Sequence, residues 1–207
     1  MSRDWYAWYA AYDEPGSALD VRLRIVQRHI AAWLATVDGP ARAVSACAGQ
    51  GRDLLPVLAA SPRGASVRAR LVELDPANAA VARSLAAGLD AEVVVGDAGV
   101  TDAYLGAVPA DLVLLCGIFG NVPEADIRRT VAALPMLCAP GATVIWTRHR
   151  KAPDLTPAVR SWVVDAGCAE VAFEGVAETS FVGVGVARFT GTPVPLEPGV
   201  RLFAFEP

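Results

Sequence analysis

The sequence predicts an α/β fold: a doubly wound, mostly parallel seven-stranded sheet with an antiparallel C-terminal strand pair. Strand-length apolar runs alternate with helical patterns from about residue 41 to residue 166, and parallel neighbours need such crossover helices on both sheet faces. Two strand patterns then follow each other with no helix between them, which is typical of an antiparallel edge. A chain of 207 residues with 54% hydrophobic residues suits one domain with one sizeable core.

The elements are expected in a fixed order along the chain. An amphipathic helix over 17–37, with Ser17 as N-cap and Gly39-Pro40 as its stop, precedes the first strand. Strands are expected at 41–47, 66–74, 91–95, 111–116, 142–147, 169–173 and 181–189. Helices are expected after Gly51 and at 78–87, 124–138 and 156–166, and a last short strand at 200–205.

Composition excludes several classes of function. A formal net charge of -4 gives no positive field to attract nucleic acid. No apolar run approaches the roughly 18 residues that span a bilayer, and the first residues do not resemble a signal peptide. Four cysteines without a Cys-x-x-Cys pair, and two histidines, favour reduced thiols over a zinc site or disulfides. We therefore expect a cytoplasmic protein with no metal and no membrane partner; the sequence does not indicate its oligomeric state.

Ligands of a doubly wound sheet bind beyond the carboxyl ends of its strands, so these junctions are the candidate sites. At the first, small residues turn from Cys47 towards Asp53 and a helix, which lets backbone amides approach a ligand; a tight turn without a ligand is the alternative. At the second, Glu73 ends a strand about 22 residues beyond Gly51, a spacing at which an acid accepts both hydroxyl hydrogens of a ribose.

Two further junctions follow the third and fourth strands. Asp97, in a Gly-Asp pair, is either the acceptor for an adenine amino group or part of a simple turn. The loop 116–122 is apolar and flanked by glycines. Its Ile118 and Phe119 either form the wall of a ligand pocket or belong to the core at the start of a helix. Both interpretations stay open.

These junctions occur in the order seen in class I S-adenosylmethionine-dependent methyltransferases, and residues 41–189 resemble that family. The resemblance implies a Rossmann-like fold with S-adenosylmethionine as cofactor. The family's glycine-rich first motif falls on residues 47–51, its ribose-binding acid on Glu73 and its adenine-contacting acid on Asp97. The cofactor-binding set that the resemblance implies is Cys47, Ala48, Gly49, Gly51, Glu73, Leu74, Asp97, Ala98 and Cys116.

The resemblance also implies how the chain is divided. The sequence departs from the family's pattern at two positions. Residues 1–40 would form a lid and helix, 41–150 the cofactor-binding core and 151–207 the part with the edge strands, all in one domain over 1–207. Ser45 stands where many members carry an acid, which weakens contact to the cofactor's amino group. Cys47 replaces the first glycine of the loop and narrows the space there.

The acceptor side is expected at the N-terminus and after the fifth strand. Trp5, Tyr6 and Tyr9 either close over the site as a lid that contacts substrate or staple the first helix to the sheet. Arg148 is a candidate to hold a carboxylate or phosphate of the substrate, and His149 is the candidate catalytic base; a solvated basic loop is the alternative. His29 is expected on the charged surface face of the first helix, together with Arg22, Arg24 and Arg28, and not in catalysis.

The function predicted from these residues is methyl transfer to an O or N nucleophile of a small molecule. One alternative is a nicotinamide-dependent oxidoreductase, against which Asp53 and Leu54 break the Gly-x-Gly-x-x-Gly pattern after Gly51. The other is a non-catalytic protein that keeps the fold and binds a partner. The acceptor itself is not specified, because fold analogy does not supply a substrate.

Overall fold

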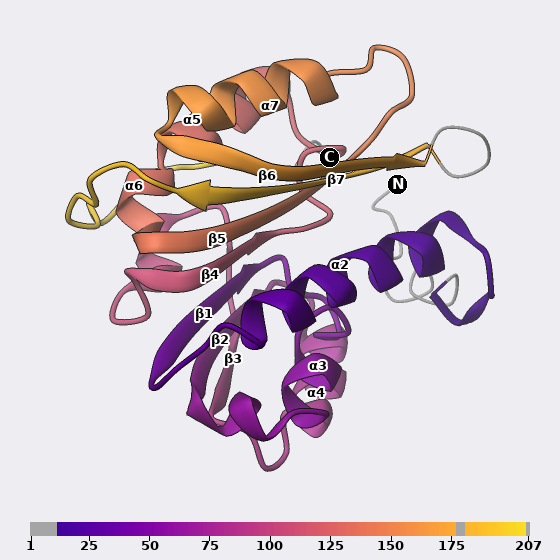
Figure 1. Ribbon diagram of the computed structural model, residues 1–207, viewed down its shortest axis with the longest axis vertical. Coiled ribbons are helices and arrows are strands. Elements are labelled where there is room, and N and C mark those ends of the chain that lie inside the picture. Colours follow the sequence, from indigo (N-terminus) through magenta and orange to yellow (C-terminus); the bar gives the residue numbers. More distant parts are fainter. Residues whose placement is uncertain (1–11, 177–180, 206–207) are drawn as a thin grey trace.

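The structure is a computed structural model that describes residues 12–176 and 181–205. Seven strands form one sheet in the order β3-β2-β1-β4-β5-β7-β6 (Figure 1). Pairing is parallel from β3 to β5, whereas β7 runs antiparallel to both β5 and β6. This arrangement confirms the doubly wound, mostly parallel sheet and the antiparallel strand pair predicted from the sequence.

The strands lie close to their predicted positions. The buried strands are rich in Val, Leu and Ala because both faces of a parallel sheet are covered. Their bounds are β1 (Ala41–Ala46), β2 (Val67–Glu73), β3 (Ala91–Val95), β4 (Ala110–Leu115), β5 (Cys138–His149), β6 (Cys168–Val176) and β7 (Val182–Phe189).

The helices follow the predicted order with one correction, and the last predicted strand needs another. Their bounds are α2 (Ala18–Leu34), α3 (Leu55–Ala59), α4 (Pro76–Leu85), α5 (Glu124–Ala132), α6 (Leu134–Leu137) and α7 (Thr156–Asp165), with 3-10 turns η2 (Pro62–Ser66) and η3 (Thr101–Tyr104). Ser17 caps α2 as predicted, since its side chain accepts the Asp20 N–H at 3.1 Å. The helix predicted over 124–138 is divided because Pro135 fits only the first turn of a new helix. The last strand predicted over 200–205 is instead one bridge between Arg201 and Val100.

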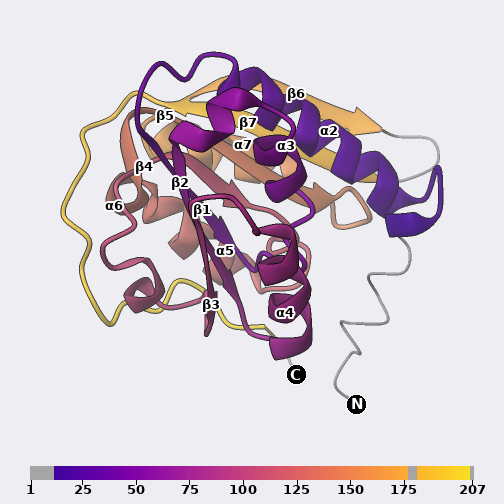
Figure 2. The same ribbon diagram turned by 90° about the horizontal axis from the view of Figure 1, so that it is seen from below.

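The helices cover the two faces of the sheet (Figures 1 and 2). Neighbouring residues of β5 point to opposite faces: Trp146 packs with residues of α5, α6 and α7, and Ile145 with residues of α2, α3 and α4. No helix in residues 12–176 or 181–205 has both the length and the apolar character needed to cross a membrane.

The chain after β7 returns to the carboxyl edge of the parallel strands. It first passes α6, where the Val194 N–H donates to the Pro135 carbonyl at 2.9 Å. It then reaches the loop after β3, where Arg201 bridges to Val100. The C-terminal residues therefore lie next to the edge at which ligands of this sheet type bind.

Candidate functional site

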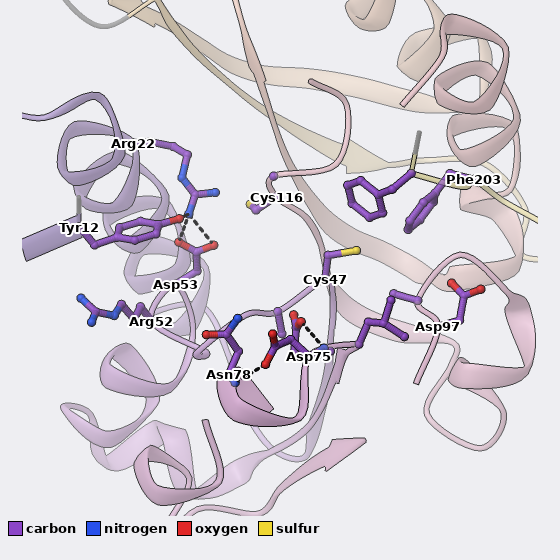
Figure 3. A pocket seen from close by; sticks show the side chains of 16 residues that line it. Tyr12, Arg22, Cys47, Arg52, Asp53, Asp75, Asn78, Asp97, Cys116 and Phe203 are labelled. Carbon is purple, nitrogen blue, oxygen red and sulfur yellow. Dashed lines mark hydrogen bonds and ion pairs between the residues drawn. The ribbon is translucent and has the colours of Figure 1, made fainter. Parts of the chain in front are cut away.

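A pocket lies at the carboxyl ends of β1, β2 and β4 and beside the loop after β3 (Figure 3). Side chains from α2, the strand ends and the C-terminal segment contribute to its wall. The lining residues are Tyr12, Arg22, Cys47, Ala48, Arg52, Asp53, Glu73, Leu74, Asp75, Asn78, Asp97, Ala98, Cys116, Gly117, Phe203 and Phe205. Seven of the nine residues that the family resemblance implies for the cofactor are in this wall; Gly49 and Gly51 lie in the adjoining loop.

The loop after β1 is held in a conformation that favours glycine. Cys47, Gly49 and Gly51 all have positive φ, at 50°, 56° and 73°. A side chain in the left-handed region costs roughly 1–2 kcal/mol, so the cysteine that replaces the first glycine is strained. A Cβ on Gly51 would lie 2.5 Å from the Leu55 Cδ1 atom. Gly51 therefore allows α3 to pack directly against the loop.

Glu73 occupies the end of β2 with its carboxylate fixed by two backbone donors. One oxygen accepts the Gly49 N–H at 2.7 Å and the other accepts the Asp75 N–H at 2.8 Å. Burial nevertheless raises the pKa of this carboxyl above its ordinary value, because the removal of water outweighs these hydrogen bonds. Each carboxylate oxygen has a further lone pair with which it can accept a hydroxyl. Asp75 caps α4 by accepting the N–H groups of Ala77 and Asn78.

Asp97 lies after β3 at the opposite end of the pocket from Arg22 (Figure 3). Its Oδ1 accepts the Gly99 N–H at 2.7 Å, and its Oδ2 accepts from Arg201. Leu74, which is 67% exposed, and buried Ala98 provide apolar surface in the same pocket. This end of the pocket combines a held carboxylate with apolar walls.

Sequence reasoning missed the polar cluster at the other end. Arg22 donates to both carboxylate oxygens of Asp53, at 3.0 and 3.2 Å, and to the Tyr12 hydroxyl. Its guanidinium also lies 5.3 Å from the centroid of the Tyr12 ring. Burial raises the pKa of Tyr12 well above its ordinary value, so the phenol stays neutral. The pocket thus places a guanidinium, a carboxylate and a phenol side by side.

The expected surface position of Arg22 is therefore wrong: Arg22 is buried and faces the pocket. A signal was present in the sequence, since Arg22 stands one helical turn before Val26 and two before Ile30, on the buried face. His29, by contrast, pairs with Glu174 of β6, with 2.6 Å between the two side chains. It takes no part in the pocket among the described residues.

The two cysteines of the pocket are free thiols. Burial raises the pKa of both Cys47 and Cys116 above the ordinary thiol value, and for Cys47 the nearby Glu73 carboxylate adds to the effect. A thiol becomes a strong nucleophile only as its anion. Cys47 and Cys116 therefore act as small wall residues here and are not prepared for nucleophilic attack.

Arg148 and His149 end β5 but do not line this pocket as the described residues define it. Arg148 is only 9% exposed, and its Nε and Nη1 atoms are buried without a hydrogen-bond partner among the described residues. The Nδ1 atom of His149 is likewise buried and unpartnered there. Burial lowers the pKa of His149, and the charges of Arg148 and Lys151 lower it further. Its imidazole is therefore neutral at neutral pH.

One interpretation of the sequence placed Phe119 in the wall of a ligand pocket, but Phe119 is not among the described residues that line this pocket. Phe119 is fully buried, and its ring centroid lies 6.2 Å from that of Trp146. This position agrees with the core interpretation of the loop and not with the pocket wall. Trp5, Tyr6 and Tyr9 lie outside the described residues.

Comparisons with known proteins show which solved structures share this fold. No protein-family model and no curated protein sequence matches the chain. Magnesium protoporphyrin IX methyltransferase from Synechocystis PCC 6803, solved with bound S-adenosylmethionine, superposes with a TM-score of 0.64 at 15% identity, over 90% of this chain and 91% of that one. A Burkholderia thailandensis 1,6-didemethyltoxoflavin-N1-methyltransferase gives a TM-score of 0.62 at 19% identity, over 90% and 89%.

A third structure, an O-methyltransferase family protein from Burkholderia thailandensis, matches with a TM-score of 0.59 at 19% identity. The match covers 82% of this chain but spans only 57% of that protein. At these identities the likeness concerns the fold. The chain has the fold of class I S-adenosylmethionine-dependent methyltransferases, including the reversed strand β7.

Proposed function

We propose that this protein binds S-adenosylmethionine and transfers its methyl group to an O or N nucleophile of a small molecule. The observation that carries the proposal is the position of Glu73 and Asp97. Glu73 ends β2, Asp97 follows the adjacent parallel strand β3, and both line one pocket together with apolar residues. In such a fold, this pair matches the ribose hydroxyls and the adenine amino group of the cofactor.

The adenosine half of the cofactor fits the β2 and β3 side of the pocket. Glu73 would accept the two ribose hydroxyls through the lone pairs left over from its backbone hydrogen bonds. Asp97 would accept the amino group of the adenine. Leu74 and Ala98 supply apolar surface for the base. The small residues of the loop after β1 let its backbone approach the cofactor, although Cys47 narrows the space at its start.

The methionine half fits the cluster of Tyr12, Arg22 and Asp53. This half carries an ammonium and a carboxylate, and the cluster offers an anion and a cation that are already paired with each other. Ser45 stands where many class I methyltransferases carry an acid in the first strand, and Asp53 would take over the role of that acid. The bound cofactor supplies an electrophilic sulfonium methyl group, so the protein mainly needs to align the nucleophile and remove its proton.

The acceptor is proposed to contact the end of β5. Because its pKa is lowered, His149 is neutral and able to accept a proton from a hydroxyl or amine. Arg148 carries a buried charge with two unpartnered nitrogens among the described residues, and a carboxylate or phosphate on the acceptor would compensate it. Two of the structurally similar methyltransferases are named for small molecules, magnesium protoporphyrin IX and 1,6-didemethyltoxoflavin, and this supports a small-molecule acceptor.

The cofactor proposal is tested by calorimetric titration of the purified protein with S-adenosylmethionine, S-adenosylhomocysteine and NADH. We expect saturable binding of the first two only, and its loss in Glu73→Ala. Glu92→Ala is the matched control, because Glu92 is an exposed acid of β3 paired with Arg70. Binding of NADH alone would favour an oxidoreductase, and equal affinity of Glu73→Ala and wild type would remove Glu73 from the site.

The acceptor proposal needs a separate measurement. Small molecules with and without a carboxylate or phosphate are incubated with enzyme and cofactor, and S-adenosylhomocysteine formation is followed. We expect turnover with anionic acceptors, lost in both Arg148→Gln and His149→Gln. Cofactor binding without turnover of any acceptor would favour a non-catalytic protein instead.

A further inference from the structure

We infer that the C-terminal segment 197–205 completes the adenine end of the proposed cofactor site: Arg201 positions the Asp97 carboxylate, and Phe205 forms an aromatic wall for the base. This inference rests on the proposed function and deepens it. It assigns nucleobase recognition to residues that follow the last strand of the sheet and lie about 100 positions beyond Asp97 in the sequence.

The segment is fixed to the loop after β3 by backbone contacts. The Leu202 N–H donates to the Gly99 carbonyl at 2.7 Å, and the Thr101 N–H donates to the Val200 carbonyl at 3.1 Å. A Cβ on Gly99 would lie 2.2 Å from the Phe203 carbonyl oxygen. Gly99 therefore permits an approach that any larger residue would block, and the segment packs directly on the loop that carries Asp97.

The same segment is fixed on its other side to α5. The Thr130 hydroxyl donates to the Leu202 carbonyl at 3.2 Å. The Ala204 N–H donates to the Asp126 carboxylate at 2.8 Å. Since these contacts stand on either side of Phe203, the backbone that carries the two phenylalanines is held between the β3 loop and α5.

Arg201 reaches from this segment to Asp97. Its guanidinium donates to Oδ2 of Asp97, while the Gly99 N–H donates to Oδ1. The two side chains are 48% and 47% exposed, and an ion pair at such exposure contributes little to stability. Its main effect is to fix the rotamer of Asp97, which directs the remaining lone pairs of the carboxylate for a hydrogen-bond donor of the ligand.

The aromatic side chains of the segment lie in the same part of the pocket. Phe203 is buried, and Phe205 is 38% exposed. Their rings pack edge to face, with centroids 5.8 Å apart and an interplanar angle of 88°. Both line the pocket with Asp97 and Ala98, and Figure 3 shows the Phe203 ring above this end. A purine base that reaches Asp97 has an aromatic surface beside it, an arrangement that favours stacking.

The test compares S-adenosylhomocysteine with S-inosylhomocysteine, in which a carbonyl oxygen replaces the adenine amino group. Calorimetry is done on wild type, Phe205→Ala, Phe205→Tyr, Arg201→Ala and Arg201→Lys. Val194→Ala is the control for an exposed apolar residue of the same C-terminal stretch. Arg68→Ala is the control for an exposed ion pair, here with Asp90. Thermal unfolding of each variant identifies any loss of fold.

We expect Phe205→Ala to lower the affinity for both ligands by about tenfold, and Phe205→Tyr to bind both with an affinity close to that of wild type. Arg201→Ala should weaken the binding of S-adenosylhomocysteine more than that of S-inosylhomocysteine. The ratio of the two affinities, which reports the preference for the adenine amino group, should therefore fall, and Arg201→Lys should restore part of it. A merely structural role would not change that ratio. If wild type binds and both alanine variants match it within about twofold, the inference is wrong and the proposed function stands. If wild type binds neither ligand, both are wrong.

Discussion

The Glu73 carboxylate accepts the Gly49 N–H at 2.7 Å, so the acid at the end of β2 and the glycine loop after β1 are held as one unit. The second carboxylate oxygen accepts the Asp75 N–H, which connects the same unit to the start of α4. Glu73 therefore acts on the shape of the loop as well as on any hydroxyl in the pocket. A substitution at this position tests both roles.

Glu73→Gln is expected to weaken S-adenosylhomocysteine binding by about tenfold to hundredfold, because hydrogen bonds to a charged group contribute roughly 1.5–3 kcal/mol. The amide keeps one acceptor oxygen, but its NH2 group would face the other of the two backbone N–H donors and leave it unpaired. That loss costs about 1–3 kcal/mol, and removal of a charge that burial disfavours offsets part of it, so we expect the free energy of unfolding to fall by about 1–2 kcal/mol. Calorimetry and thermal unfolding measure the two effects, and unchanged affinity would contradict the role of Glu73.

Ligand affinity is expected to depend on pH through the same group. Burial raises the pKa of Glu73, so the carboxyl takes up a proton at a higher pH than an exposed glutamate does, and ionisation costs stability as pH rises through that pKa. A protonated carboxyl is a weaker acceptor for two hydroxyls. Titrations between about pH 5 and pH 8 should show affinity for S-adenosylhomocysteine falling on acidification in wild type but not in Glu73→Gln. Parallel profiles would argue against this cause.

The strand ends were predictable because their signal is local. Apolar periodicity fixes where a strand stops; Glu73 is the last residue of β2, and Asp97 lies two residues beyond the end of β3. Every parallel strand ends at the same sheet edge, so these residues come together without any knowledge of packing. The resemblance to a known family added proposed roles for the residues but not their geometry.

The rest of the pocket depends on contacts between distant segments. Phe203 and Phe205 line it only because the chain after β7 returns to Val100, and no local pattern encodes that path. Phe119 could not be assigned from sequence, since an apolar residue after a strand suits a wall and a core equally well. Helical periodicity alone would have placed Arg22 on the buried face of α2, but its charge suggested a solvent-exposed position.

Arg22→Ala is expected to destabilise the protein by about 2–3 kcal/mol, because it leaves Asp53 without its partner in a largely buried pair. Arg24→Ala is the control on the same helix; its ion pair with Asp20 involves an exposed arginine, so we expect a change within about 0.5 kcal/mol. Chemical denaturation measures both. Similar losses in the two variants would show that the Arg22 pair contributes no more than a surface one.

The double variant Arg22→Met/Asp53→Leu separates stability from binding. Replacing both charges with apolar groups should recover most of the stability lost in Arg22→Ala, since no unpaired buried charge remains. Affinity for S-adenosylhomocysteine should be lower than in wild type, because the ammonium and carboxylate of its amino-acid end lose their partners. Recovery of affinity together with stability would remove Arg22 and Asp53 from the proposed site.

Gly185 is expected to tolerate no side chain. A Cβ there would lie 2.1 Å from Cε2 of Trp146, and Trp146 is packed between Phe119 and Phe173, with centroid distances of 6.2 and 5.9 Å. Overpacking should therefore cost about 3 kcal/mol in Gly185→Ala. Gly96→Ala is the control, because its nearest neighbour atom would be 3.7 Å away. Equal unfolding midpoints for the two variants would show that the indole can move aside.

His149 is expected to titrate below the ordinary histidine value of about 6.5. Burial lowers its pKa most, the charges of Arg148 and Lys151 lower it further, and a backbone hydrogen bond with Gly120 acts in the opposite direction. The chain has two histidines, so His29→Gln leaves one imidazole, whose ring protons report the pKa by NMR. Adding Arg148→Gln should raise that pKa towards the ordinary value.

The sign of the linked stability effect follows from the same depressed pKa. On acidification the unfolded chain binds the histidine proton first, so the contribution of His149 to stability is lost as pH falls from the unfolded pKa through the folded one. This loss should be absent in His149→Gln. A measured pKa at or above the ordinary value would contradict burial as the cause of the shift, and one that Arg148→Gln leaves unchanged would show that the charge of Arg148 does not act on the imidazole. Only a pKa raised well above neutral pH would keep the imidazole charged there, and a charged imidazole cannot accept the proton of an acceptor hydroxyl, so that result would remove His149 as the catalytic base.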